Sequence, residues 1–425
     1  MKPAEYTFAD FHVQLQALLP GGVQGQVGKP PYFSGYSYGT LYDWDAYFES
    51  IVWLYAGFPA DYVRHAVQLF LARQQENGLI HRTVPPGGET SYVKHQVHAK
   101  PFLAQTTLLI RSAEGAGGLD WLGDDHGYER LKKYLDYWLF ALDVRGAGLS
   151  IWQEAEHTGM DNHYERAGDW HGVNRFCEGV DLNSYLVREC QAFAIIAAEL
   201  GYTDDAATYT KLGEQRSAAI QEWLWDDEAG LFLDYHALEE RSIPVRYVGT
   251  FLPLWSATAT DEQAGRLVHE HLLNEREFAR PWPIPGLAAS EPGYVEGHLE
   301  GHSTGCCSWR AHTWVPTNYM VFQGLRRYDF HEEAGTLAER TWHLFQRGRF
   351  CEYYTSEGGI GTGLKPFRGW SCLAPFMPLE YETGCDPTAL NPNNHAQTVV
   401  RACIRSLRKS KKEMNSHEVP RHTVT

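Results

Sequence analysis

Residues 148–170, GLSIWQEAEHTGMDNHYERAGDW, combine aromatic side chains, five acidic residues and a central turn. The turn-prone residues 157–162, HTGMDN, surround Asp161, so we expect this acid on a loop held between helices. A carboxyl group on such a loop beside an aromatic ring is shielded from water, which raises its pKa and suits it to be a general acid. The plainer alternative is that Asp161 caps the next helix, since Asp is common at helix starts.

Helical patterns dominate the sequence on both sides of this stretch. Apolar residues recur at helical spacing in segments 1–19, 46–55, 61–74, 100–111, 127–143, 182–200, 204–224, 261–273, 317–328 and 334–346, and 370–376 begins the last core helix. Short connections alternate with long loops rich in glycine and aromatic residues, at 21–44, 77–98, 148–172, 280–313 and 351–370. In a closed ring of antiparallel helix pairs, these long loops would share one face and build one cleft. The pattern therefore predicts an all-α toroid.

The domain organisation follows from composition. No break in composition marks a second domain, so we expect a single domain over residues 1–406. Residues 407–425 form a polar, basic tail that we expect to be disordered at its end.

The composition also excludes several classes of partner. The net charge of −16 argues against nucleic-acid binding, and an anionic ligand would need a local cation. The eight cysteines fit no zinc spacing, so we expect no metal, no cofactor and reduced thiols. Residues 1–19 do not read as a signal peptide, and no apolar run approaches membrane-spanning length. We expect a cytoplasmic protein without a membrane partner.

A second carboxyl group is needed if Asp161 is a general acid. Inverting glycoside hydrolysis uses two carboxyl groups about 6.5–9.5 Å apart, one to protonate the leaving group and one to activate water. The candidates on or near other long loops are Glu352, Glu357 and Glu380, and their setting leaves the choice open. No nucleophile elbow, phosphate loop or dinucleotide fingerprint competes, because GGIGTG at 358–363 lacks the Lys-Ser/Thr that a phosphate loop requires.

Several motifs together carry a resemblance to a known family. They are YGTLYDWD at 38–45, ENGLIHR at 76–82, GMDN at 159–162, DLN at 181–183, WRAHTWVPTNY at 309–319, EYY at 352–354 and FRGWS at 367–371. In this order they resemble glycoside hydrolase family 63, with the closest likeness to mannosylglycerate and glucosylglycerate hydrolases. The likeness runs from about Tyr32 to about Phe376.

The resemblance implies a six-hairpin (α/α)6 barrel and an inverting α-glycosidase without a metal. It implies that Asp161 is the general acid and that Glu352, rather than Glu357, is the general base. Other residues match positions that bind the substrate: the aromatic walls Tyr38, Trp44, Trp309 and Trp314, and the polar residues Asp45 and Gln105. Ser308 departs from the pattern, because an aromatic residue is expected before the tryptophan.

Recognition of a glycerate carboxylate would need a partner from the loops. Arg166, Arg310, Lys100 and Tyr92 are the candidates, and the sequence does not choose among them. Plainer alternatives exist: the tryptophans as core residues, the arginines as partners of nearby acids, and Gln105 as a buried hydrogen-bonding residue.

The sequence therefore favours a hydrolase that releases an α-linked hexose from glycerate, its partner being a small glycoside. The alternatives are hydrolysis of another α-glucoside, such as trehalose or a glucose-terminated oligosaccharide, a histidine-dependent sugar epimerase, and a sugar-binding relative without catalysis. The choice between mannose and glucose, and between a monomer and a homo-oligomer, stays open.

Overall fold

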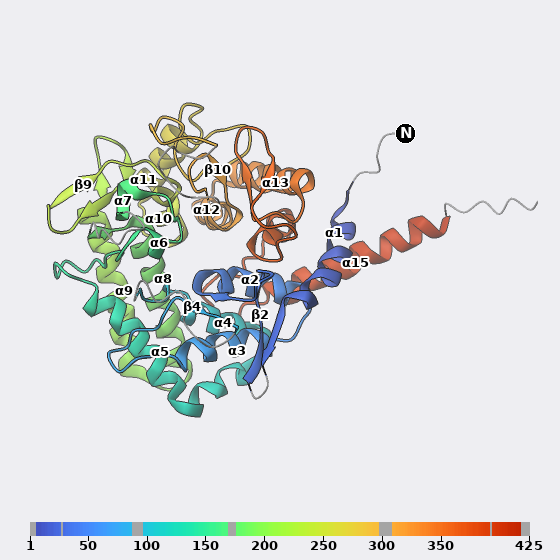
Figure 1. Cartoon of the computed structure of the whole chain (residues 1–425), viewed down its shortest axis with the longest axis horizontal. Coiled ribbons are helices and arrows are strands. Elements are labelled where there is room, and N and C mark those ends of the chain that lie inside the picture. Colours follow the sequence, from blue (N-terminus) through green and yellow to red (C-terminus); the bar gives the residue numbers. More distant parts are fainter. Residues whose placement is uncertain are drawn as a thin grey trace, which may run out of the picture.

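The computed structural model describes residues 6–26, 29–86, 97–168, 176–296, 308–391 and 393–417. Helices dominate these residues (Figure 1). An inner set consists of α2 (Asp43–Tyr55), α4 (Leu103–Glu114), α8 (Val180–Glu199), α10 (Leu252–Trp255) with η4 (Val248–Phe251), α12 (Val315–Arg327), and η6 (Trp370–Phe376) with α14 (Met377–Thr383). Along this set α2 packs on α4, α4 on α8, α8 on α10, α10 on α12 and α12 on η6, and η6 returns to α2. The inner elements thus form a closed ring.

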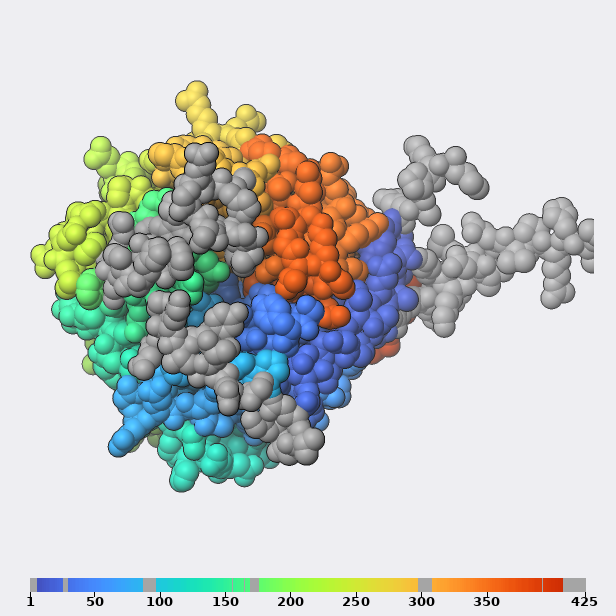
Figure 2. All heavy atoms as spheres, in the orientation of Figure 1, coloured from blue at the N-terminus to red at the C-terminus, as the bar shows by residue number. Residues whose placement is uncertain are grey.

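Burial explains why these helices are inside. Every residue of α2 is buried, and α12 is buried from Val315 to Leu325. A helix that is buried on all faces has to lie within the core. Figure 2 shows blue N-terminal segments meeting orange segments near residue 350 at the surface, whereas the contact between α2 and η6 that closes the ring is buried.

A second set of helices packs outside the ring. It contains α1 (Phe8–Leu18), α3 (Asp61–Leu71), α5 (Gly127–Asp136) with η3 (Tyr137–Ala141), α9 (Thr203–Trp223), α11 (Asp261–Arg266) with η5 (Leu267–Leu272), α13 (His331–Gly348) and α15 (Ala396–His417). Each of the best-formed members buries one stripe: α3 buries Val63, Ala66, Val67, Phe70 and Leu71, at helical spacing. These helices cover the ring and leave their polar faces in water.

The connections hold short helices and small antiparallel sheets. The helices are η1 (Leu19–Gly22), η2 (Ala116–His126), α6 (Ala155–Thr158) and α7 (Tyr164–Ala167). The sheets are β1 (Val23–Gln26) with β2 (Lys29–Phe33); β3 (Leu41–Tyr42) with β4 (Thr83–Val84); β5 (Cys177–Glu178), β8 (Asp234–His236) and β9 (Arg241–Ile243); β6 (Trp225–Asp226) with β7 (Leu231–Phe232); and β10 (His312–Thr313), β11 (Tyr353–Thr355) and β12 (Gly361–Thr362). They join loops that lie far apart in the sequence: Leu41 pairs with Val84, and His312 with Thr355.

Two features of the structure were not expected from the sequence. The fold is helical as predicted, but it is not purely α, because the long loops pair with one another through these strands, and the expected loop 21–44 contains the β1–β2 hairpin. The tail expected from residue 407 is helical through His417, since α15 begins at Ala396 and buries Val400 and Ile404. Figure 1 shows α15 beside α1 and running outward from the body. Residues 418–425, the end of the tail, lie outside the described residues.

None of the helices within the described residues has both the length and the apolar character needed to cross a membrane.

Candidate functional site

One cavity brings most of the predicted site residues together. Its volume is about 270 Å³, and it is lined by Tyr36, Tyr38, Tyr42, Trp44, Asp45, Arg82, Gly159, Asp161, Trp309, Trp314, Glu352, Leu364 and Trp370. All of these residues stand in the first turn of a ring element or in the segment that leads into one, namely α2, α4, α8, α12 and η6.

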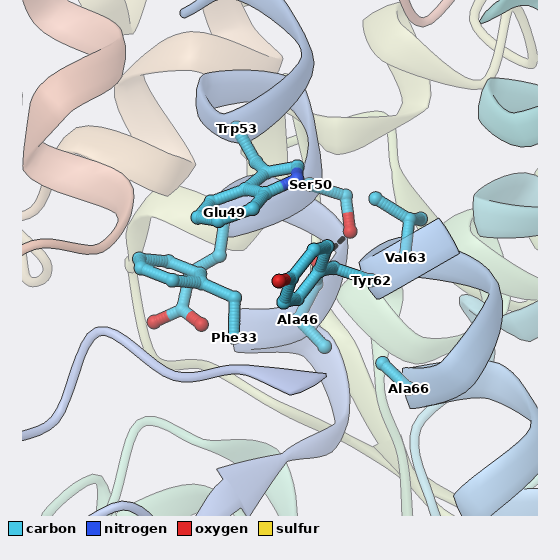
Figure 3. A pocket seen from close by; sticks show the side chains of 8 residues that line it. All are labelled: Phe33, Ala46, Glu49, Ser50, Trp53, Tyr62, Val63 and Ala66. Carbon is cyan, nitrogen blue, oxygen red and sulfur yellow. Dashed lines mark hydrogen bonds between the residues drawn. The ribbon is translucent and has the colours of Figure 1, made fainter. Parts of the chain in front are cut away.

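The small cavity between α2 and α3 does not compete as a substrate site. Its volume is about 10 Å³, enough for no more than one water molecule. Figure 3 shows that Trp53, Phe33, Tyr62 and Val63 enclose most of it. The Glu49 carboxylate beside it accepts a hydrogen bond from the Gly35 N–H at 2.9 Å.

Asp161 lies in the turn between α6 and α7, on a loop as predicted. The turn approaches Trp44 closely because residue 159 is glycine: a Cβ there would lie 2.8 Å from the Trp44 ring, and φ is +78°. Burial raises the pKa of Asp161 to about 7, against the opposing attraction of Arg82. At neutral pH this carboxyl group is therefore poised to hold and give up a proton.

Glu352 also lines the cavity, and it lies in the C-terminal part of the chain, immediately before β11. Its side chain is 4% exposed, and Oε2 accepts a hydrogen bond from the Leu364 N–H at 3.0 Å. Its backbone carbonyl accepts bonds from Trp370 Nε1 at 2.8 Å and Ser371 Oγ at 2.9 Å. This carboxyl group is therefore held on a fixed backbone.

The other two carboxyl candidates lie elsewhere. Glu357 does not line the cavity: it forms a 2.7 Å ion pair with Arg280, which lowers the Glu357 pKa. Glu380 is fully buried in the core, where it accepts bonds from Tyr55, Tyr319 and Gln323. Of the three candidates, only Glu352 shares the cavity with Asp161.

Aromatic rings form the walls of the cavity. Trp309 and Trp314 stack with centroids 3.9 Å apart and planes 5° apart, and Trp314 stacks on Tyr353 at 4.3 Å. The ring centroids of Trp44 and Trp309 lie 5.6 Å apart. Tyr38 is 51% exposed and lies at the rim. Apolar rings of this kind suit the faces of a sugar.

Asp45 supplies a polar group inside this aromatic wall. Its Oδ1 accepts a hydrogen bond from Tyr36 Oη at 2.9 Å, and burial with the nearby Asp43 raises its pKa. Asp43 itself pairs with Lys100 at 3.1 Å, with both side chains fully buried. Lys100 is therefore neutralised beneath the cavity and does not line it.

Two predicted site residues belong to buried networks outside the cavity. The Gln105 amide donates to Glu189 at 3.2 Å and accepts from Arg188 at 3.1 Å. Arg166 is fully buried and pairs with Asp181 at 3.0 Å and Asp234 at 2.5 Å. For both residues the structure favours the plainer alternative.

The remaining two candidates are also away from the lining. Arg310 pairs with Glu165 at 2.8 Å and does not line the cavity. Tyr92 lies outside the described residues, as do Asp169 and Trp170 at the end of the 148–170 stretch.

Arg82 lines the cavity although the sequence analysis did not single it out as a site residue. It donates to the Glu156 carbonyl, and within the described residues its buried Nε has no hydrogen-bond partner. The β3–β4 pairing positions it, because the Asp43 N–H donates to the Arg82 carbonyl at 3.1 Å. Its place in the ENGLIHR motif was the available signal. Tyr36, Tyr42, Leu364 and Trp370 also line the cavity without having been singled out.

Within the described residues, no three His, Cys, Asp or Glu side chains are gathered as metal ligands.

Two curated proteins are similar to parts of this sequence. A mannosylglycerate hydrolase of Thermus thermophilus is 32% identical over 169 residues, 37% of this chain and 38% of that protein. A mannosylglycerate hydrolase of Rubrobacter radiotolerans is 25% identical over 203 residues, 48% of this chain and 44% of that protein. The chain thus matches less than half the length of these curated relatives.

A solved structure extends the likeness to most of the fold. The glycoside hydrolase family 63 mannosylglycerate hydrolase from Thermus thermophilus, in complex with Tris and D-glycerate, has a TM-score of 0.69 at 19% identity, over 87% of this chain and 99% of that one. The sequence profile of the mannosylglycerate hydrolase MGH1-like glycoside hydrolase domain matches residues 38–371, which include every residue of the cavity lining except Tyr36. The chain belongs to this family, that of the mannosylglycerate hydrolase MGH1-like glycoside hydrolase domain.

Proposed function

We propose that this protein is an inverting α-glycosidase that releases a hexose from mannosylglycerate, glucosylglycerate or both. The observation that carries the proposal is that Asp161 and Glu352 line one aromatic cavity. Burial raises the Asp161 pKa to about 7, which supports the role of general acid.

The mechanism needs one proton transfer at each carboxyl group. Asp161 donates its proton to the glycosidic oxygen as the bond from that oxygen to the anomeric carbon breaks. Glu352 takes a proton from a water molecule that attacks the anomeric carbon from the opposite face. The products are a β-hexose and glycerate, and the two carboxyl groups exchange their protonation states until solvent restores them.

Arg82 is the residue we assign to the glycerate carboxylate. Among the described residues it is the cation that lines the cavity, whereas Lys100, Arg166 and Arg310 lie off the lining and form ion pairs with acids. An arginine bond to a carboxylate is charge-assisted and contributes about 1.5–3 kcal/mol. The D-glycerate complex of the solved relative supports the choice of aglycone.

The sugar subsite is assigned to the aromatic walls and Asp45. Trp44, Trp309 and Trp314 offer ring faces, and the Asp45 carboxyl group offers oxygen atoms to sugar hydroxyls. We further propose that the closed ring with its outer helices is a six-hairpin (α/α)6 barrel forming a single domain, which puts every lining segment at one end of the barrel.

The test is a comparison of kcat/KM between matched acid and alcohol substrates. Glucosylglycerate is compared with glucosylglycerol, mannosylglycerate with mannosylglycerol, and trehalose is included as a neutral α-glucoside. We expect about a 10–100-fold preference for the acid in at least one pair, from one charge-assisted contact. Equal values within both pairs, or trehalose as the best substrate, would replace the glycerate assignment with a neutral α-glucoside.

A further inference from the structure

A row of contacts ties the turn carrying Asp161 to the segment carrying Trp309. Asn162 Oδ1 accepts a hydrogen bond from the Trp309 N–H at 2.9 Å, and His163 Nε2 lies 2.9 Å from the Trp309 carbonyl oxygen. Burial lowers the His163 pKa, so the ring is neutral, and its Nδ1 has no partner among the described residues. We therefore assign the proton to Nε2, which donates. The side chains of Asn162 and His163 thus bind the backbone N–H and the backbone carbonyl of Trp309.

The segment around Trp309 is fixed on its other side as well. Residue 286 has to be glycine, because a Cβ there would lie 1.7 Å from the Trp309 carbonyl oxygen. The Leu287 N–H donates to the Arg310 carbonyl at 2.9 Å. Arg310 in turn pairs with Glu165, from the helix that follows the acid's turn, at 2.8 Å. Trp309 is therefore clamped between the turn and the 286–287 segment.

From Trp309 a stack of rings leads to the other carboxyl group. Trp309 stacks on Trp314, and Trp314 stacks on Tyr353 with planes 14° apart. Tyr353 is the residue next to Glu352. Stacked aromatic pairs contribute about 0.5–1.5 kcal/mol each beyond their buried area, so the three rings resist sliding apart.

We propose that Asn162 and His163 are positioning residues that, through the Trp309–Trp314–Tyr353 stack, set the separation between the Asp161 and Glu352 carboxyl groups. Neither side chain lines the cavity, so both act through Trp309. The inference rests on the proposed function, because an inverting enzyme needs a separation that admits one water beside the sugar. A displacement of about 1 Å in such a site costs about 100-fold in rate.

The first test is Asn162→Ala, which removes the acceptor for the Trp309 N–H. On whichever glycoside the wild type hydrolyses, we expect kcat to fall about 100-fold and by a larger factor than KM rises, since Trp44 and Asp45 still contact the sugar whereas the separation of the carboxyl groups is lost. The basic limb of the pH–rate profile should also move to lower pH, because a loosened turn lets water reach Asp161.

A matched control separates positioning from general loss of stability. Asn394 is half-buried and makes three backbone bonds before α15, away from the cavity, including 2.8 Å to the Asp386 carbonyl. Asn394→Ala should lower the melting temperature without changing the pH–rate profile. If Asn162→Ala behaves like Asn394→Ala in both respects, the proposal is overturned.

A second readout is independent of catalysis. Closely stacked indole rings, here those of Trp309 and Trp314, give an exciton couplet in the far-ultraviolet circular dichroism spectrum. The couplet is the signal that the wild type shows and Trp314→Phe lacks. Asn162→Ala should lose this couplet, and Asn162→Asp, which keeps an acceptor, should retain it. An unchanged couplet in Asn162→Ala contradicts the proposal, whereas a wild type inactive on every glycerate glycoside contradicts only the proposed function. Should Asn162→Ala fail to fold, His163→Leu against His163→Gln makes the same comparison, with loss of the couplet expected only in the former.

Discussion

Asp161 and Glu352 line the same cavity, although they stand on loops that lead into different ring elements, α8 and η6. Both loops lead into the closed ring of helices, and the stack of Trp309, Trp314 and Tyr353 ends at the residue next to Glu352. A pair of carboxyl groups in one cavity is what glycoside hydrolysis requires.

Removing either carboxyl group should abolish most of the turnover. Asp161→Asn and Glu352→Gln should each lower kcat by about 10²–10⁴-fold, since each loses one proton transfer. Glu357→Gln is the matched control, because Glu357 pairs with Arg280 outside the cavity. Steady-state kinetics with circular dichroism decides the matter, and a greater loss in Glu357→Gln than in Glu352→Gln would reassign the base.

The pH dependence of kcat/KM should be bell-shaped. Activity should fall as the pH rises through about 7, because Asp161 then loses the proton that it has to donate. It should fall at acidic pH as Glu352 takes up a proton and ceases to be a base. A rate that keeps rising to alkaline pH would rule out Asp161 as a protonated acid.

The buried Asp161 should also reduce stability. Its folded-state pKa, about 7, lies above the unfolded value of about 3.9, so the folded state binds the proton more tightly. Stability contributed by the protonated form is complete below about pH 4 and is lost as the pH rises towards 7. Asp161→Asn should therefore melt above the wild type at neutral pH, with the difference vanishing near pH 4. Equal melting temperatures at both pH values would show that Asp161 is not destabilised by burial.

Substitutions at Arg82 and Arg166 should distinguish recognition of the substrate from stability of the fold. Arg82→Ala should lower kcat/KM for the glycerate glycoside by about 10–100-fold and leave the glycerol glycoside nearly unchanged, if Arg82 binds the carboxylate. Arg166→Ala should instead destabilise the fold by about 3–5 kcal/mol, because it leaves Asp181 and Asp234 buried without their cation. Denaturant unfolding and kinetics on both substrates measure the contrast. Equal losses on acid and alcohol in Arg82→Ala would remove it from carboxylate recognition.

The long helices could be predicted closely because their apolar patterns extend over many residues. The segments 182–200 and 204–224 correspond to α8 (Val180–Glu199) and α9 (Thr203–Trp223). The strands could not be predicted, since two-residue pairs such as Leu41–Tyr42 with Thr83–Val84 have no period of their own. The helix α15 was missed because its polar, basic composition resembles a disordered tail.

Site residues could be predicted where a sequence motif carries them. They could not be predicted where the role of a charged side chain depends on its ion-pair partners. Asp161, Glu352, Trp44 and Asp45 reach the cavity, as the motifs implied. The roles of the cations could not be predicted in this way. Arg166 is neutralised by Asp234, which is distant in the sequence, while Arg82 lines the cavity. Which charges find partners is settled by tertiary contacts that local patterns do not contain.

The most direct test of the account follows the anomeric protons by NMR while the wild type hydrolyses α-glucosylglycerate and α-mannosylglycerate. An inverting enzyme that uses Asp161 as acid and Glu352 as base releases the β-hexose first, and the α-anomer grows in only by later mutarotation. The account predicts this order of appearance with at least one of the two substrates. It also predicts that Asp161→Asn loses the release of the β-hexose. Early appearance of the α-anomer, or no hexose from either substrate, would contradict it.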